Sequence, residues 1–297
     1  MEENSMRLHF QGADVLYPLS VIRGRLRLAG LSHLESSSVL DDVTSNYESV
    51  SLENLLNKVQ EHLEKDYASV ADDFGMLTKY EELRAVQAVP SLVVIMSGAS
   101  ATGKSIIALE IVNDLVATRF ISSDTVRQVL RNTLDEKKYP ELFTHTYQAH
   151  VHRQAGPEDL TPQVRGFLAQ CELVTPLIRS MTEKVLSEGT LGVVEGVHVI
   201  PGELKDLGIG VVEVLINPEK DVHRLMFISK HGSGLRTVSE DLGTREQEFI
   251  AAREIQSYLV DVASKREIPA IRMTDFEEAY REVAKVILDR VKTVVMM

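Results

Sequence analysis

The chain has 297 residues, of which 44% are hydrophobic and 26% are charged, so it is globular and long enough for one large domain or two modest ones. Its formal net charge of −12 argues against nucleic acid as a partner, because binding to the phosphate backbone needs clustered Lys and Arg. The apolar runs are too short for a bilayer, no signal peptide pattern opens the sequence, and the single cysteine, Cys171, allows no internal disulfide, so we expect a cytoplasmic protein without membrane contact.

The first 88 residues are predicted to form a mainly helical domain. They contain one candidate strand, at 8–16, followed by helical patterns such as the leucine and valine repeat over 52–63 behind Ser51, a suitable N-cap. Pro90 disfavours helical backbone at Val89. We therefore place a boundary here, with one domain at 1–88 and a second at 89–297.

In the second domain, strand and helix patterns alternate. The candidate strands are 92–96, 119–122, 191–195, 211–216 and 270–273. The last helix is predicted to open with Thr274 and Glu277, which together match a capping box. The alternation predicts an α/β fold with a mostly parallel sheet flanked by helices, in which functional side chains gather at the carboxyl ends of the strands.

A glycine-rich loop follows the first of these strands. Its letters, GASATGKS, fit the GxxxxGK[ST] phosphate loop, with an apolar strand before it and an apolar helical pattern after it. A chance glycine loop is the alternative, but the strand and helix on either side are the context that the motif requires. The predicted nucleotide-binding residues are Gly98, Ala99, Ser100, Ala101, Thr102, Gly103, Lys104 and Ser105.

This loop predicts binding of ATP with Mg²⁺. The glycines permit backbone angles that turn the N–H groups inward around a phosphate, and the helix that follows adds its positive dipole end. Lys104 has the length to reach the β- and γ-phosphates, and the Ser105 hydroxyl is a ligand for Mg²⁺.

The second strand ends in an acidic and basic segment, with Asp124, Arg127 and Arg131 on one face of the next helix. An N-capping aspartate with two solvated arginines is the structural alternative. Beside a phosphate loop, we favour a functional interpretation, in which Asp124 orients an attacking hydroxyl and the arginines bind an anionic acceptor.

The third strand ends in Glu195, Gly196 and His198. An acid at this position holds Mg²⁺, directly or through water, in many enzymes with a phosphate loop. His198 is either a substrate contact or a polar residue that closes the strand. Further on, the basic and glycine-rich segment 230–236 suits a lid, in which Arg236 would cover the transferred group, although a solvated basic loop remains the alternative.

The segments GASATGKS, ISSDTVRQVLR and EGVHVIPG, in this order, resemble the archaeal-type 2-phosphoglycerate kinase family. The resemblance covers roughly residues 90–272 and is supported by segments 166–170 and 253–260. Residues 18–31 are more loosely similar to the ATP-cone-like region that precedes the kinase in this family, although a helical cover or a homodimer surface is an open alternative. The sequence departs from the family pattern at Ser97, Ala101 and Ile106.

The resemblance implies phosphoryl transfer from ATP to a hydroxyl of 2-phosphoglycerate, giving 2,3-bisphosphoglycerate, or transfer to a related small anionic hydroxy compound. Lys104, Asp124 and Arg236 would act in catalysis, Ser105 and Glu195 would hold Mg²⁺, and Arg127, Arg131 and His198 would bind the acceptor. Two alternatives remain open at this point. One is a kinase of nucleotide sugars or nucleic-acid ends, and the other is a nucleotide-binding regulatory protein.

Overall fold

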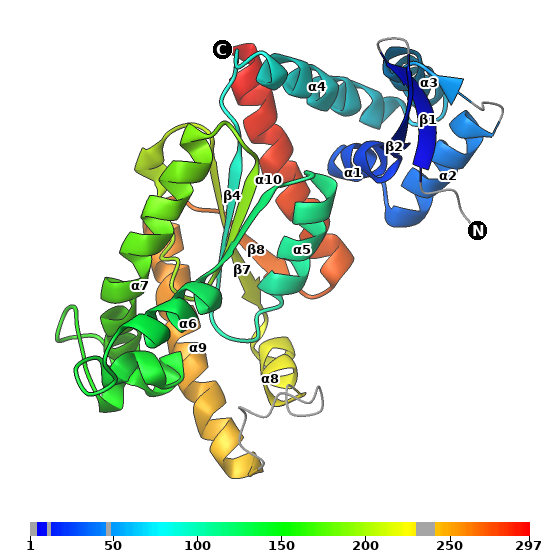
Figure 1. Cartoon of the computed structure of the whole chain (residues 1–297). Helices are drawn as coiled ribbons and strands as arrows, with labels where there is room; N and C mark the ends of the chain where they lie inside the picture. The colour runs from blue at the N-terminus through cyan, green and yellow to red at the C-terminus, as the bar shows by residue number, and fades with distance from the viewer. Residues whose placement is uncertain (1–4, 11–12, 46–48, 230–240) are drawn as a thin grey trace.

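The computed structural model describes residues 5–10, 13–45, 49–229 and 241–297 (Figure 1). In the described part of the N-terminal region, four helices accompany a small sheet with the strand order β2-β1-β3. The elements of this region are β1 (Ser5–Phe10), β2 (Ala13–Pro18), α1 (Ser20–Leu28), α2 (His33–Thr44), β3 (Ser49–Val50), α3 (Leu52–Asp66) and α4 (Ala68–Ala85).

The single strand predicted at 8–16 is wrong. The segment forms two antiparallel strands, β1 and β2, in which Phe10 lies opposite Ala13. The chain therefore reverses direction inside the predicted strand, and an apolar pattern that spans both arms cannot reveal a turn by itself. The helix predicted behind Ser51 is confirmed as α3, and the Ser51 hydroxyl accepts a hydrogen bond from the backbone N–H of Asn54 at 3.2 Å.

The second region has a five-stranded sheet with helices on both faces. In chain order its elements are β4 (Val93–Ser97), α5 (Lys104–Asp114), β5 (Arg119–Ser122), α6 (Ser123–Thr133), the 3₁₀ helices η1 (Pro140–Phe143) and η2 (Thr146–Val151), α7 (Pro162–Ser187), β6 (Gly192–Gly196), the 3₁₀ helix η3 (Lys205–Leu207), β7 (Val211–Pro218), α8 (Lys220–Ser229), α9 (Leu242–Lys265), β8 (Ala270–Met273) and α10 (Phe276–Met296).

All neighbouring strands of this sheet are parallel, in the order β5-β6-β4-β7-β8. The five predicted strands are confirmed within two residues at each end, and so is the predicted α/β class. The crossover from β4 through α5 leads to the edge strand β5, and β6 then returns to lie between the two. The carboxyl end of β4, where the glycine-rich loop begins, is therefore central, and β6 lies directly beside it.

The central strand is buried on both faces, as the layers in Figure 1 require. Leu92, Val94 and Met96 pack into the core beneath α5 and α10, whereas Val93 and Ile95 pack into the core beneath α6 and α7. Alternation of side chains along a strand sends neighbouring residues to opposite faces, so a continuous apolar run fits a position between two helical layers.

The N-cap of α10 lies one residue after the predicted N-cap, Thr274. Its N-cap is Asp275, whose carboxylate accepts hydrogen bonds from the N–H groups of Glu277 and Glu278 at 2.9 and 3.1 Å. Thr274 instead donates its hydroxyl to the Glu278 side chain. An aspartate next to the predicted threonine is an equally good cap, and the sequence pattern alone did not separate the two.

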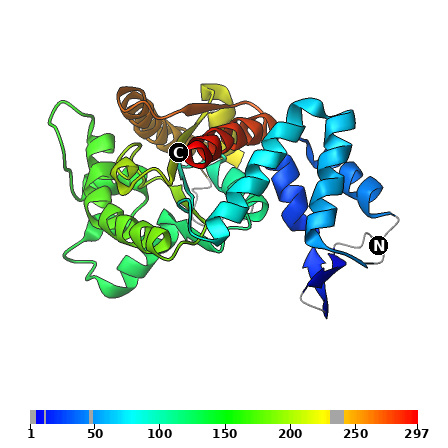
Figure 2. The ribbon, with the colours of Figure 1, turned by 90° about the horizontal axis from the view of Figure 1, so that it is seen from above.

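The N-terminal region packs against α5 and α10, and the hydrophobic core continues from one region into the other (Figure 2). Arg27 of α1 donates to Asp114 at the end of α5 and to Glu110 on the same helix, at 2.8 Å each. The Tyr280 hydroxyl of α10 donates to the same Asp114 carboxylate at 2.6 Å. In the part of the chain that the structure describes, no helix combines the length and apolar composition needed to cross a membrane.

Candidate active site

The glycine-rich loop connects β4 to α5 and depends on backbone conformations that most residues avoid. Gly98 and Gly103 have φ values of 152° and 85°. A Cβ at Gly103 would lie 3.0 Å from both Met226 Cε and Phe276 Cε1, so conformation and space both favour glycine there. Ala101 also lies in the left-handed region, with φ at 66°. The departure from glycine at position 101 is therefore a point of backbone strain.

Two buried side chains, one from α9 and one from α8, form hydrogen bonds to the backbone of this loop. Gln256 of α9 accepts a hydrogen bond from the Ala99 N–H at 2.8 Å and donates to the carbonyl of Ile216 at 3.1 Å. His223 of α8 lies 2.8 Å from the Ser100 carbonyl, so its Nε2 carries the hydrogen that is donated. Both side chains are fully buried. Sequence analysis missed the role of His223, because no motif surrounds it.

Lys104, Ser105 and Glu195 meet where β4 and β6 run side by side. Their parallel register pairs Met96 with Glu195, which sets the carboxylate beside the loop. The Ser105 hydroxyl donates to Glu195 Oε2 at 3.0 Å, and Lys104 Nζ lies 3.9 Å from the same oxygen. The predicted neighbours of the metal are thus brought together.

This group of side chains fits a magnesium ion. A hydroxyl and a carboxylate are the hard oxygen ligands that Mg²⁺ accepts, and Glu195 is only 5% exposed. Within the described residues, no group of three or more His, Cys, Asp or Glu side chains is arranged to hold a metal. The donor set thus suits Mg²⁺, which in nucleotide enzymes keeps waters and phosphate oxygens as its other ligands, and not a metal that needs a full protein cage.

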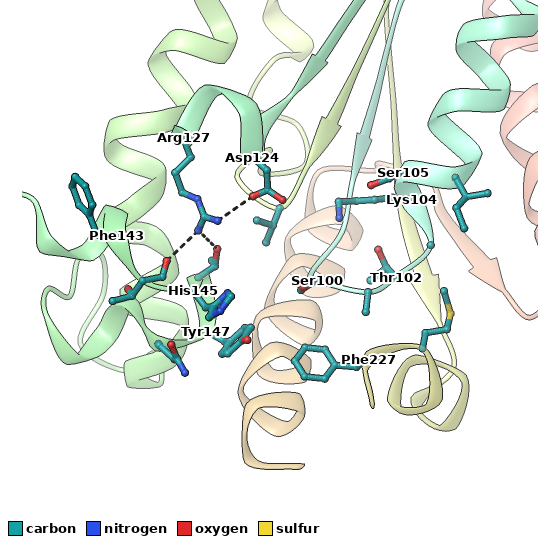
Figure 3. Close-up of a pocket in the computed structure, with 18 of the residues that line it drawn as sticks. Ser100, Thr102, Lys104, Ser105, Asp124, Arg127, Phe143, His145, Tyr147 and Phe227 are labelled. Atoms are coloured by element: carbon teal, nitrogen blue, oxygen red, sulfur yellow. Dashed lines mark hydrogen bonds and ion pairs between the residues drawn. The ribbon is translucent and has the colours of Figure 1, made fainter. Parts of the chain in front are cut away.

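A cavity of about 740 Å³ lies in front of the loop (Figure 3). Residues 100–106 form one wall, and Asp124, Arg127 and Arg131 of α6 form the facing wall together with residues 143–148. In Figure 3, Lys104 and Asp124 face the same space from opposite sides. The phosphate loop, Asp124 and the two arginines therefore share one site, as a kinase requires.

Asp124 is exposed to this cavity and does not cap its helix. The N-cap of α6 is Ser122, whereas Asp124 lies in the first turn with its side chain 71% exposed. Its carboxylate is 3.4 Å from Nη2 of Arg127. The structural alternative, an N-capping aspartate, is therefore wrong, and the carboxylate lies at the cavity wall beside Arg127.

The two arginines are fixed by the chain segment between η1 and η2. Arg127 Nη1 donates to the Thr144 carbonyl at 3.2 Å and to the Thr146 hydroxyl at 3.3 Å. Arg131 donates from Nε to the Leu142 carbonyl at 2.5 Å and from Nη2 to the Thr144 carbonyl at 3.2 Å. Burial lowers the pKa of both guanidinium groups, and the charge of Arg127 lowers that of Arg131 further. Two cations held this close favour an anion between them and the loop.

His198 does not line the cavity, so the predicted substrate contact is not found in this structure. Its side chain is fully buried, and its ring nitrogens contact Ser123, Thr146 and Gln170. Burial lowers the pKa of the imidazole to about 3, and the nearby charge of Arg127 adds to this effect. The ring is neutral at physiological pH and holds protein groups in place.

The remaining predictions have different outcomes. Arg236 and the whole predicted lid at 230–236 lie outside the described residues. Arg253 and Tyr258 of α9 line a separate cavity of about 420 Å³, together with residues 159–161 and the first turn of α7. The segment 143–148 was missed entirely, although the rings of His145 and Tyr147 stack there with centroids 5.1 Å apart. It carries no recognisable motif.

Several known proteins are similar to this chain in sequence. No family model matches the chain. A 2-phosphoglycerate kinase of Methanothermobacter thermautotrophicus is 28% identical over 231 residues, which cover 76% of this chain and 73% of that protein. The 2-phosphoglycerate kinase of Methanococcus maripaludis strain C5 is 24% identical over 302 residues, with 97% and 94% covered, and that of Pyrococcus horikoshii is 26% identical over 232 residues, with 78% and 74% covered.

Among solved structures, the similarity is more distant. A shikimate kinase from Acinetobacter baumannii in complex with shikimate has a TM-score of 0.40 at 13% identity and covers 71% of this chain and 97% of its own. The protein TT1252 from Thermus thermophilus has a TM-score of 0.42 at 16% identity, with 68% and 98% covered. The sequence relatives carry the assignment: the predicted resemblance is confirmed, and the chain is a P-loop phosphotransferase similar over most of its length to archaeal 2-phosphoglycerate kinases.

Proposed function

We propose that this enzyme transfers the γ-phosphoryl group of ATP to the free hydroxyl of 2-phosphoglycerate, or of a closely related anionic hydroxy compound. The observation that supports this proposal most directly is the shared cavity, in which Asp124 and two arginines face Lys104 and the glycine-rich loop. The names of the curated relatives favour 2-phosphoglycerate among the acceptors that such a cavity would accept.

The nucleotide would bind through the loop. Backbone N–H groups of residues 101–105 and the Lys104 ammonium would hold the β- and γ-phosphates at the N-terminus of α5. Ser105 and Glu195 would hold Mg²⁺, which when bound neutralises charge on the phosphate oxygens. Because Glu195 Oε2 already accepts from the Ser105 hydroxyl, both ligands lie at the same point of the wall.

The acceptor would bind against α6. Arg127 and Arg131 would attract its phosphate and carboxylate, while the Asp124 carboxylate accepts a hydrogen bond from its hydroxyl. The hydroxyl oxygen then attacks the γ-phosphorus, the bond between that phosphorus and the bridging oxygen to the β-phosphate breaks, and the hydroxyl proton moves to Asp124. The products are ADP and a bisphosphorylated acid, 2,3-bisphosphoglycerate in the favoured reaction.

We also propose that residues 1–88 form a region with its own role, as the loose ATP-cone-like similarity suggests. Arg27 forms ion pairs with α5, and these fix the N-terminal region against the second region. The two regions also share one hydrophobic core, so the proposed boundary does not separate two independent cores. A regulatory nucleotide and a homodimer surface both remain compatible with this region.

The test of the function is a direct assay of the product. Purified protein is incubated with ATP, Mg²⁺ and 2-phosphoglycerate, and ³¹P NMR follows the appearance of 2,3-bisphosphoglycerate. A panel of glycerate, 3-phosphoglycerate, nucleotide sugars and 5′-hydroxyl oligonucleotides serves as the comparison. Product from 2-phosphoglycerate alone, or from close analogues, supports the proposal. ATP hydrolysis that no acceptor stimulates would favour a regulatory protein, and transfer to a nucleotide sugar or oligonucleotide would replace the proposed acceptor.

A further inference from the structure

The buried imidazole of His198 connects three elements that meet behind the acceptor wall. Its Nδ1 lies 3.2 Å from the hydroxyl of Ser123, which opens α6, and its Nε2 lies 2.8 Å from Oε1 of Gln170 on α7. The same Nε2 lies 3.4 Å from the hydroxyl of Thr146 in η2. His198, Ser123 and Gln170 are fully buried, so these contacts are shielded from water.

The direction of each hydrogen bond follows from the carbonyl groups around Gln170. Its Nε2 lies 2.5 Å from the Glu141 carbonyl and 3.4 Å from the Thr144 carbonyl, and both can only accept. The amide must therefore donate to them and accept at Oε1. His198 then carries its hydrogen on Nε2 and donates it to Gln170, while its Nδ1 accepts from the Ser123 hydroxyl. One tautomer of the ring satisfies all of these groups.

This network and the two arginines hold the same chain segment from opposite sides. The Thr144 carbonyl accepts from Gln170 on the buried side and from Arg127 and Arg131 on the cavity side. The Thr146 hydroxyl is likewise shared between Arg127 and His198. Movement of His198 or Gln170 would therefore move the groups that orient both arginines.

The approach of Ser123 to β6 is also built into the sequence. A Cβ at Gly196 would overlap the Ser123 hydroxyl, so glycine at this position permits the contact between the start of α6 and the end of β6. Ser123 is the residue before Asp124, and Glu195 is the residue before Gly196. Asp124 and the predicted metal ligand Glu195 are thus each one residue away from the contact between Ser123 and Gly196.

We propose that His198 and Gln170 are positioning residues that set the acceptor wall, formed by α6 and residues 142–146, at its distance from the phosphate loop. The proposal rests on the kinase function proposed above. Neither side chain touches the substrate. Their effect is on the placement of Asp124 and the arginines, so their loss weakens use of the acceptor and leaves the nucleotide wall unchanged.

The test compares Gln170→Met with the wild-type enzyme. Methionine keeps the length and volume of glutamine and removes all three hydrogen bonds. We expect the KM for 2-phosphoglycerate to rise about 10- to 100-fold and kcat to fall, because a small misplacement of a catalytic wall has effects of this size. The KM for ATP should stay within about twofold, because no bond of the network reaches the loop. Hydrogen–deuterium exchange should become faster in the peptide 142–148 and stay unchanged in 104–114.

Further variants separate a positioning role from an effect on stability alone. His198→Gln keeps a side-chain N–H that can donate to Gln170, whereas His198→Leu does not. The KM for 2-phosphoglycerate should therefore rise much less in His198→Gln than in His198→Leu. Thr175→Val is the matched control, because the Thr175 hydroxyl of α7 donates to the His198 carbonyl at 3.0 Å without contacting the ring. It should leave both the acceptor KM and the exchange of 142–148 unchanged. If Gln170→Met does not fold, Ser123→Ala tests the same network from its other end.

Wild-type acceptor KM together with wild-type exchange in folded Gln170→Met would overturn the proposal, and so would an equal loss of ATP affinity. If the wild-type enzyme phosphorylates no hydroxy acid, the proposed function fails by itself. The exchange measurement then still decides whether the network holds residues 142–148.

Discussion

The two walls of the cavity are built in different ways. The nucleotide wall comes mainly from one short run, residues 98–105, in which backbone N–H groups and adjacent side chains would bind the phosphates. The acceptor wall is assembled from α6, the segment 142–146, α7 and His198, which are joined by side-chain hydrogen bonds over separations of 11 to 75 residues. The first wall is therefore a property of a local sequence, and the second is a property of tertiary packing.

The two walls differ because ATP is common to many enzymes, whereas the acceptor differs among them. A triphosphate is the same in every ATP-dependent enzyme, so a local loop can bind it with main-chain groups. The acceptor changes from enzyme to enzyme, and the side chains that we propose bind it here are held by a network in which each member depends on the others. Variants on the two walls should therefore fail in different ways.

The largest effect is expected at Lys104. We expect Lys104→Met to lower kcat/KM about 1,000-fold or more, because a charged donor aimed at the transferring phosphoryl group is lost. Steady-state assays with ATP and 2-phosphoglycerate measure this change. Lys137→Met, at an exposed position outside the cavity, is the control and should retain wild-type rates. Wild-type activity in Lys104→Met would remove the loop from the mechanism.

On the acceptor wall, Asp124→Asn should separate binding from turnover. The amide keeps the shape of the side chain but accepts no proton, so kcat should fall about 100- to 1,000-fold. The Kd for ATP, measured by calorimetry, should not change, because the residue lies on the facing wall. Unchanged turnover would show that Asp124 neither orients nor deprotonates the hydroxyl.

A smaller effect on the same wall is expected from Arg127→Met. Loss of one guanidinium should raise the KM for 2-phosphoglycerate about 10- to 100-fold and leave the KM for ATP within about twofold, since a charge-assisted hydrogen bond contributes roughly 1.5–3 kcal/mol. Arg119→Met removes an exposed arginine from β5 and serves as the control. Equal effects on both KM values would contradict the division into two walls.

The free energy of unfolding should also depend on pH, because His198 is buried behind the acceptor wall. Its pKa is about 3 in the folded protein against 6.5 ordinarily, so the unfolded chain binds one proton more between these values. Stability from this group is complete above pH 6.5 and falls as the pH is lowered. Between pH 7.5 and 5.0 the loss is about 2 kcal/mol. Urea unfolding at both values checks this, and the stability difference between wild type and His198→Gln should shrink at pH 5.0. A constant difference would indicate that His198 is not buried as the neutral form.

The smallest effect tests the strain in the nucleotide wall. Ala101 has φ at 66°, a conformation that costs an alanine about 1–2 kcal/mol, whereas the extra freedom of glycine in the unfolded chain costs about 0.4–1 kcal/mol. Ala101→Gly should therefore raise the free energy of unfolding by up to about 1 kcal/mol. Ala251→Gly, inside α9, should lower it by about 1 kcal/mol and provides the contrast. A destabilised Ala101→Gly would show that the loop gains from the methyl group.

Sequence reasoning found the elements whose signals are local. The five strands of the parallel sheet were predicted because short strand patterns alternate with longer helical ones, and the phosphate loop because its motif stands between a strand and a helix. Asp124, Arg127 and Arg131 were predicted from helical spacing, and the structure brings them to the loop. The β1–β2 turn and the capping residue of α10 were misassigned, since two arrangements fitted the same letters equally well.

By itself, the sequence determined that the chain has an α/β fold with a phosphate loop, since these properties follow from patterns a few residues long, and its resemblance to a known family indicated a kinase. Only the tertiary structure decided that His198 is an internal support and not a ligand contact, that Thr144 and Thr146 join the arginines, and that Gln256 and His223 brace the loop. These roles depend on which elements pack together. A hydrogen bond between residues far apart in the chain leaves no spacing that a single sequence can reveal.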